Sequence, residues 1–281
     1  MLTGPGVAGS MASSRKALAA TLLVVLTAGC ATTRHNTEPA PRRSLRAATL
    51  DEVLTAYDDY CRGFDTLRAS GDLDVRDLRS GKSQKLGIRV VAARGGRLYL
   101  KGSVAVVSAL EVVSDGRQFW FQLPTKKKVW TGDASGSAPE AVDDKAPYYV
   151  LHPSDVTTAL VPEPLAPGPD ESLVLEADAQ NFSLTLARLE GGRGIARRRV
   201  WVNRDTLQPS RLRAYDARGD VASDAVFSGF EDGAPRSITI RRPAEGYEAV
   251  FALDKLERNV AVPEKAFTGR IPEGFAVVEV H

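Results

Sequence analysis

The side chains that could do chemistry in this sequence are few, and their spacing assembles neither a catalytic site nor a metal site. The three histidines are His35, His152 and His281, and none lies at metal-ligand spacing from another histidine or a cysteine. The acidic pairs Asp58-Asp59 and Asp143-Asp144 are sequence neighbours, which is the wrong geometry for two carboxylates that share a substrate. No nucleophile elbow, phosphate-binding glycine loop or dinucleotide fingerprint occurs. We therefore expect no enzyme, no cofactor and no metal, with His152 as a lone base the remaining catalytic alternative.

The two cysteines have different surroundings. Cys30 follows the apolar run Ala17–Ala28, which itself follows the basic pair Arg15-Lys16. A basic stretch, about a dozen apolar residues and a small-residue exit describe a secretory signal, and the run is shorter than the roughly 20 residues that a membrane span needs. Cys61 lies on the apolar side of an expected helix and is interpreted as a small buried hydrophobe, with a reactive thiol as the alternative.

The segment "LTAGC", which ends at Cys30, resembles the lipobox of bacterial lipoproteins, where cleavage precedes a cysteine that becomes diacylated. An ordinary signal with a coincidental cysteine is the alternative. The resemblance implies a signal peptide over 1–29, a lipidated cysteine and flexible tether over 30–47, and one domain over 48–281. Because Ala31 stands where an aspartate would indicate inner-membrane retention, we expect a lipid anchor in the outer membrane, facing the periplasm.

The charge of the expected mature chain is balanced. The whole sequence has 37 basic and 35 acidic side chains, and its first 29 residues contain two basic and no acidic ones. The small basic excess therefore belongs to the signal, and nothing in the charge favours a nucleic-acid partner. Since acylation would occupy Cys30, no internal disulfide is available, and stability must come from a core.

The elements that position these residues are one helix and many strands. Thr49 and Glu52 have capping-box spacing, and Val53, Tyr57, Tyr60, Phe64 and Leu67 form one apolar stripe, which predicts a helix over residues 49–70 that Gly71 ends. Beyond Gly71 the apolar period changes to two, and hairpin turns are expected at Asp115-Gly116, Gly191-Gly192, Arg218-Gly219 and Glu245-Gly246.

No alternation of strands and helices appears, so the sequence favours a single large, curved antiparallel sheet. One face of such a sheet needs a cover, and only the first helix and an insertion at about residues 134–169 are available. Within that insertion Ser154 could cap a short helix that ends before Pro162. An arginine that points into the covered space, such as one of Arg197–Arg199, could hold a lipid head group or latch the lid.

The order of these segments resembles the LolA/LolB superfamily of lipoprotein carriers and receptors. The resemblance rests on "LYLKG…VVSDGRQFWFQLPTKKKVWTG", on "VNRDTLQPSRLRAYDARGDVASDAVFSGF" and on the tail "NVAVPEKAFTGRIPEGFAVVEV". It implies a mainly β (α+β) fold, an incomplete antiparallel β-barrel of about eleven strands covered by a helical lid. It also implies an apolar cavity for lipid or lipoprotein acyl chains, whose expected lining is Tyr57, Tyr60, Phe64, Phe119 and Phe121.

LolB-like receptors also present an exposed apolar loop that delivers cargo to the membrane. The matching region here is "GSVAVVSAL", with Val104, Val106, Val107 and Leu110 as the expected acyl-chain or membrane contacts. A plain buried strand is the alternative, because valine suits strands. Taken together, we expect a membrane-anchored lipoprotein for lipid or lipoprotein transport, and the rival is an envelope scaffold or sensor that binds other envelope proteins.

Overall fold

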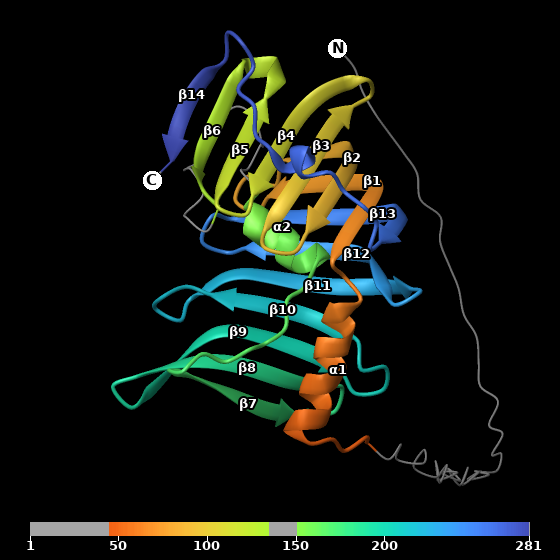
Figure 1. The fold of residues 1–281 in the computed structure, drawn as a ribbon, viewed down its shortest axis with the longest axis vertical. Helices are drawn as coiled ribbons and strands as arrows, with labels where there is room; N and C mark the ends of the chain where they lie inside the picture. Colours follow the sequence, from red (N-terminus) through yellow and green to blue (C-terminus); the bar gives the residue numbers. More distant parts are fainter. Residues whose placement is uncertain (1–44, 135–150, 281) are drawn as a thin grey trace, which may run out of the picture. The chain divides into compact units, whose positions relative to one another are not determined.

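A computed structural model describes residues 45–134 and 151–280, and one sheet with fourteen strands dominates that part of the chain (Figure 1). Its helices are α1 (Leu50–Arg62) and α2 (Pro153–Leu160), with short 3-10 turns η1 (Pro124–Lys126) and η2 (Glu264–Phe267). The strands are β1 (Thr66–Asp77), β2 (Ser83–Ala93), β3 (Arg97–Val104), β4 (Val107–Asp115), β5 (Gln118–Leu123), β6 (Lys128–Asp133), β7 (Glu171–Ala177), β8 (Asn181–Glu190), β9 (Arg193–Asn203), β10 (Pro209–Tyr215), β11 (Val221–Glu231), β12 (Ala234–Arg242), β13 (Tyr247–Arg258) and β14 (Ala276–Val280).

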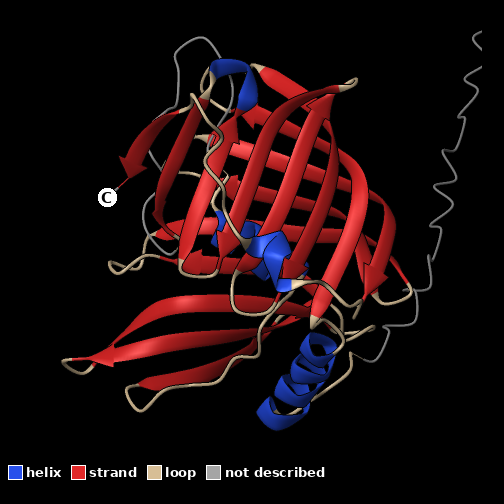
Figure 2. Ribbon diagram, turned by 45° about the horizontal axis from the view of Figure 1, so that its top comes forward, coloured by secondary structure: helices blue, strands red, loops and turns tan. Residues whose placement is uncertain are grey.

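The sheet has the strand order β14-β6-β5-β4-β3-β2-β1-β13-β12-β11-β10-β9-β8-β7. Most neighbours are consecutive hairpin strands, and the β1–β13 pair joins the two halves of the chain. The strands curve around the helices and the sheet does not close, which confirms the predicted incomplete barrel with a helical lid (Figure 2). The expected number of about eleven strands is too low for the described residues, partly because β1 occupies residues assigned to the first helix.

One pair of strands departs from the antiparallel expectation. β14 runs parallel to β6, with Val278 opposite Trp130. β14 follows β13 in the chain, and residues 259–275 carry the chain from β13 to the far edge of the sheet beside β6. That segment contacts side chains opposite the helices: Arg97 pairs with Glu264, and a Cβ at Gly269 would meet the ring of Trp120. We call this side of the sheet the outer face and the helix-covered side the inner face.

The first helix is shorter than predicted. The capping box is confirmed, since Thr49 N donates to Glu52 Oε2 at 2.7 Å and Glu52 N donates to Thr49 Oγ1 at 3.3 Å. The helix ends at Arg62, however, and the chain enters β1 at Thr66. Residues 66–70 form a strand and not a helix because β1 is hydrogen-bonded to both β2 and β13. A helix that continued to residue 70 would lose these strand pairs.

Gly71 does not end the helix but lies in the middle of β1, beside a β-bulge. The register with β13 shifts between Ser70 and Gly71. A Cβ at Gly71 would lie 1.9 Å from the carbonyl oxygen of Ala252, so only glycine permits this approach of the two backbones. The bulge also bends the strand, which helps the sheet to curve.

The four predicted hairpin turns are all confirmed. Gly116 joins β4 to β5, Gly191-Gly192 joins β8 to β9, Gly219 joins β10 to β11 and Gly246 joins β12 to β13. Each of these glycines has a positive φ, between 56° and 94°, which is the conformation that tight hairpins need.

The core lies between the inner face and the two helices. Val53, Tyr57 and Cys61 of α1 belong to the same buried apolar cluster as Val156 and Leu160 of α2 and the inward-facing side chains of the sheet. α1 contacts β8, whereas α2 contacts β2, β3, β4, β11 and β12. Within the described ranges, no helix has the length and hydropathy that a membrane span requires.

The second helix begins differently from the prediction. It does end before Pro162, but its N-cap is His152 and Pro153 occupies the first helical position, so Ser154 is not the cap. A proline is favoured at this position because its fixed φ suits the helix and its missing N–H is not needed there.

Candidate functional site

The aromatic residues expected to line a cavity lie together in the interior. Tyr57, Phe64, Phe119 and Phe121 are all buried in one apolar cluster, although they come from α1, the α1–β1 junction and β5. Tyr60 is half-buried and packs against Phe64, with 5.0 Å between the ring centroids. The space beneath the helices is therefore strongly apolar, and these aromatic side chains fill part of it.

A hydrogen bond joins the two covering segments to each other. Tyr57 of α1 donates from its hydroxyl to the carbonyl oxygen of Glu163, in the extended stretch after α2, at 3.3 Å. Desolvation raises the pKa of Tyr57 well above its ordinary value, so the phenol stays protonated and remains a donor. This hydrogen bond ties α1 to the segment that follows α2.

Four charged or polar side chains fasten α2 to the sheet, and we call them the lid latch: His152, Asp155, Arg242 and Glu245. Arg242 Nε lies 2.6 Å from Asp155 Oδ2, and its Nη1 lies 2.6 Å from His152 Nε2. The same guanidinium donates to Glu245 in the β12–β13 turn. The predicted possibility that an arginine latches the lid therefore has a structural counterpart in Arg242.

The side chains of the lid latch are largely buried, and this burial affects their pKa values. The side chains of Arg242 and Asp155 are only 11% and 10% exposed, and His152 is buried. Burial works against the charged guanidinium, but Asp155 and Glu245 raise the pKa of Arg242. Desolvation likewise opposes ionisation of Glu245, yet His152 and Arg242 lower the pKa of this carboxyl to about 2. Arg242 and Glu245 are therefore both charged at neutral pH.

The lid latch also bears on the catalytic alternative. His152 does lie near an acid, with 3.6 Å between its Nε2 and Glu245 Oε1. Its Nε2 lies between the Arg242 guanidinium and the Glu245 carboxylate, so this nitrogen is held within the lid latch and is not aimed at a nucleophile. The nearby Tyr247 is fully buried, and desolvation raises the pKa of its phenol. The contacts of the lid latch fasten α2 to the sheet.

A pocket of about 840 Å³ opens beside the lid latch. Arg242 and Glu245 line it together with the β10–β11 turn, which contributes Asp216 and Arg218. Water therefore reaches one side of the latch, which is consistent with a contact that can open.

The β3–β4 hairpin carries the residues expected to contact membrane. Val104 pairs with Val107, so Ala105 and Val106 form a two-residue turn. Val106 is 97% exposed, and Val104 and Val107 are about half exposed. Leu110 does not belong with them, because it is 2% exposed and packs into the core beside Gly102. The buried-strand alternative is therefore wrong for the three valines and correct for Leu110.

The turn residues of this hairpin are unusual. Ala105 has φ 51°, a conformation that favours glycine or asparagine, and the tip carries neither residue. An exposed valine beside a strained alanine does nothing for the stability of the turn. Such a local conflict is typical of positions kept for function.

Two further sequence expectations concern cysteines. Cys30 lies outside the described residues. Cys61 is buried and free, and desolvation raises its pKa to about 12, which fits a small core residue and makes the thiol unreactive.

The lid latch was missed by sequence reasoning. Asp155 and Arg242 are 87 positions apart, and no spacing rule connects a short loop helix to a distant strand. The available signal was weak: Arg242 ends a strand and has Glu245 three residues later, which points to a local ion pair but not to the distant Asp155.

No protein-family model and no curated protein matches the sequence. Among solved structures, a DUF1329 family protein from Desulfovibrio piger is 19% identical, covers 79% of this chain and 98% of its own, and has a TM-score of 0.52. A LolA superfamily protein from Nitrosomonas europaea is 13% identical, covers 79% and 99%, and has a TM-score of 0.51. A putative outer membrane lipoprotein-sorting protein domain from Vibrio parahaemolyticus is 12% identical, covers 77% and 96%, and has a TM-score of 0.46. The chain has the LolA-like fold, as the sequence resemblance predicted.

Proposed function

We propose that this chain is a membrane-anchored lipoprotein that binds lipid or lipoprotein acyl chains beneath α1 and α2, and that it acts in lipid or lipoprotein transport or insertion. The observation that carries the proposal is the cover of the inner face. A large apolar surface lies under two short helices, which are held by a polar lid latch and one tyrosine hydrogen bond. The LolA-like fold supports the same function, since this superfamily includes lipoprotein carriers and receptors.

Acyl chains suit this interior for a simple physical reason. Each methylene group removed from water contributes about 0.8 kcal/mol, so a diacyl anchor gains much from an apolar pocket and no chemical step is needed. Because Tyr57, Phe64 and Phe121 are buried in the closed state, binding requires the cover to move away from the sheet. The lid latch is the polar contact that such a movement would break.

The β3–β4 hairpin supports a role at a membrane surface. Its exposed valines are clustered at one tip, and isolated exposed apolar residues would carry no such meaning. We propose that this tip enters the bilayer when cargo is exchanged. The signal and "LTAGC" motif support an anchor at Cys30 and a location at the outer membrane, facing the periplasm.

The test is to purify the full chain with Cys30→Ala and to analyse it by native mass spectrometry and by lipid extraction. We expect a retained acyl lipid in a fixed ratio to protein. An Arg242→Met variant, whose cover is less firmly held, should exchange that lipid faster with added vesicles than an Arg241→Met control does. Repeated preparations without any acyl lipid would contradict the proposal.

A second function is favoured by one observation, the extent to which side chains fill the interior. Tyr57, Phe64, Phe121, Phe182 and Phe251 are essentially inaccessible to solvent. If the cover never opens, the same fold serves as a rigid scaffold or sensor for other envelope proteins. A chain that is always free of lipid, and whose α1 and α2 amides exchange only on global unfolding, would favour this alternative.

A further inference from the structure

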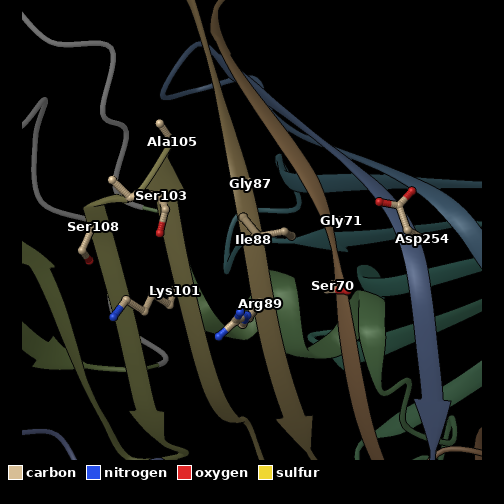
Figure 3. A pocket seen from close by; sticks show the side chains of 11 residues that line it. Ser70, Gly71, Gly87, Ile88, Arg89, Lys101, Ser103, Ala105, Ser108 and Asp254 are labelled. Carbon is tan, nitrogen blue, oxygen red and sulfur yellow. The ribbon is translucent and has the colours of Figure 1, made fainter.

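The outer face carries a pocket that the proposed acyl-chain function does not use. Its volume is about 810 Å³, and it lies over β1, β2 and β3 close to the tip of the β3–β4 hairpin (Figure 3). Gly87 helps to form the hollow: a Cβ placed there would have 3.9 Å to its nearest neighbour, the carbonyl oxygen of Ser103. A missing side chain on this face therefore leaves room for a small group.

Two cations stand next to each other in this pocket. Arg89 on β2 is directly opposite Lys101 on β3, and both point away from the core (Figure 3). Among the described residues neither forms a hydrogen bond or an ion pair. Like charges directly opposite on neighbouring strands destabilise a sheet. On its other side Lys101 is opposite Glu111 of β4, whereas Arg89 is opposite the neutral Ser70, so Arg89 has no acid directly opposite it on either neighbouring strand. An anion bound between Arg89 and Lys101 would offset their repulsion.

Hydroxyl groups complete the lining. Ser103 and Ser108 are opposite each other across β3 and β4, and Ser70 is opposite Arg89 across β1 and β2. Their side chains form no hydrogen bond with another described group, so all three are free to donate. A guanidinium, an ammonium and neutral hydroxyls are the groups that recognise a phosphate.

The acid in the pocket lies on the opposite rim. Asp254 on β13 is separated from Arg89 by the whole of β1, as Figure 3 shows. A phosphate would therefore bind on the side of Arg89 and Lys101. The negative charge of Asp254 would weaken phosphate binding from a distance. Removing that charge should therefore strengthen binding, whereas removing Arg89 and Lys101 should weaken it.

The position of the pocket selects the source of the phosphate. Lys101 is three residues behind Val104, or about 10 Å at the rise of a strand. Apolar faces of interfacial elements enter a membrane by roughly 5–10 Å, to the boundary of head groups and acyl chains. When the valine tip is inserted to that depth, Arg89 and Lys101 lie at the level of the lipid phosphates.

We propose that this outer-face pocket binds the phosphate of an anionic phospholipid head group and so orients the hairpin on the bilayer. The inference rests on the proposed function in one respect, namely that the β3–β4 tip meets a membrane. It assigns a ligand, the anionic phospholipid head group, to a second site that is distinct from the acyl-binding space beneath the helices.

The experiment measures partition of the full-length Cys30→Ala chain to phosphatidylcholine vesicles with and without 30% phosphatidylglycerol, at about 0.1 M salt. We expect tighter binding to the anionic vesicles. The Arg89→Gln/Lys101→Gln variant should bind them about thirtyfold more weakly, because each basic side chain near a membrane surface contributes about a factor of five. Its melting temperature should change little, since neither side chain forms a hydrogen bond or ion pair with a described residue. Asp254→Asn should bind more tightly than the parent.

A matched control removes two other exposed arginines outside the pocket, in Arg117→Gln/Arg193→Gln, from the β4–β5 turn and the start of β9. We expect less than a threefold change. Equal losses in both double variants would mean that net charge alone drives binding, and would overturn the proposal. Saturable binding of inorganic phosphate to the free protein at micromolar concentration, with vesicle binding unaffected by Arg89→Gln/Lys101→Gln, would instead assign the pocket to free phosphate and also overturn it. Acyl-lipid retention is measured without vesicles, so failure of this inference and failure of the proposed function are distinguishable.

Discussion

Arg242 on β12 and Asp155 on α2 form an ion pair in which both side chains are about one-tenth exposed, with 2.6 Å between Nε and Oδ2. This pair connects the lid helix to a strand that lies far from it in the sequence. Because the guanidinium also contacts His152 and Glu245, a single side chain pairs with two acids and contacts a buried imidazole.

Replacing Arg242 by methionine should therefore be costly. The change leaves two partly buried carboxylates without a cation, and removal of one partner of a buried pair typically lowers the free energy of unfolding by about 3 kcal/mol or more. The matched control is Arg241→Met, which removes an exposed arginine paired with Glu248 alone and should cost less than about 1 kcal/mol. Urea denaturation measures both, and equal effects would show that the lid latch does not stabilise the fold.

Acid should weaken the lid latch over a defined range of pH. The pKa of Glu245 is lowered from 4.5 to about 2, so its ionised form stabilises the native state fully above about pH 4.5. That contribution is lost as the pH falls through 2. We expect the urea midpoint of the parent to fall between pH 4.5 and 2, and the fall to be shallower in Glu245→Gln. An exposed-acid control, Glu273→Gln, should retain the parent slope, and a Glu245→Gln slope equal to the parent's would contradict this assignment.

The β-bulge in β1 makes Gly71 irreplaceable. A methyl group at this position would lie 1.9 Å from the Ala252 carbonyl oxygen, so the two strands must separate. We expect Gly71→Ala to lower the free energy of unfolding by about 3 kcal/mol, as severe overpacking does. Gly87→Ala, on the neighbouring strand, meets only the Ser103 carbonyl oxygen at 3.9 Å and should change the free energy of unfolding by less than about 0.5 kcal/mol. Thermal unfolding of the two variants tests this prediction. Similar melting temperatures would be inconsistent with a close approach of the Gly71 and Ala252 backbones.

The anchor is tested by replacing Cys30. If the "LTAGC" motif directs acylation, the parent chain should sediment with outer membranes and Cys30→Ala should appear in the soluble periplasmic fraction. Cys61→Ala serves as the control, because a buried core cysteine has no part in membrane attachment. Persistence of Cys30→Ala in the membrane fraction would refute a lipid anchor at this position.

Local rules predicted the parts of the fold that local physics determines. The capping box at Thr49, the glycine turns and the single curved sheet follow from short-range spacing and were confirmed. The end of α1 was wrong because the stripe that includes Phe64 and Leu67 fits both a helix and the approach to a strand. Pairing of β1 with two neighbours, which no local pattern contains, decided between them.

The candidate site was predicted less well, for the same reason. The aromatic residues were identified because buried aromatic side chains on amphipathic elements face the core. The parallel pairing of β14 and the contact of Arg242 with Asp155 depend on how distant segments meet. Residue spacing along the sequence therefore does not predict them. The tip valines were ambiguous because valine suits both strands and exposed apolar loops, and only the position of the turn at Ala105 separates the two.

The central claim is that acyl chains occupy the space beneath α1, and photo-crosslinking tests it most directly. A benzoylphenylalanine in place of Tyr60, half-buried on α1, should crosslink to acyl lipid when the chain is illuminated in its membrane. The same residue in place of Tyr99, which points to the outer face, should give no such product. Lipid adducts at position 60 alone are the predicted result. Their absence at position 60, or equal labelling at position 99, would contradict the account.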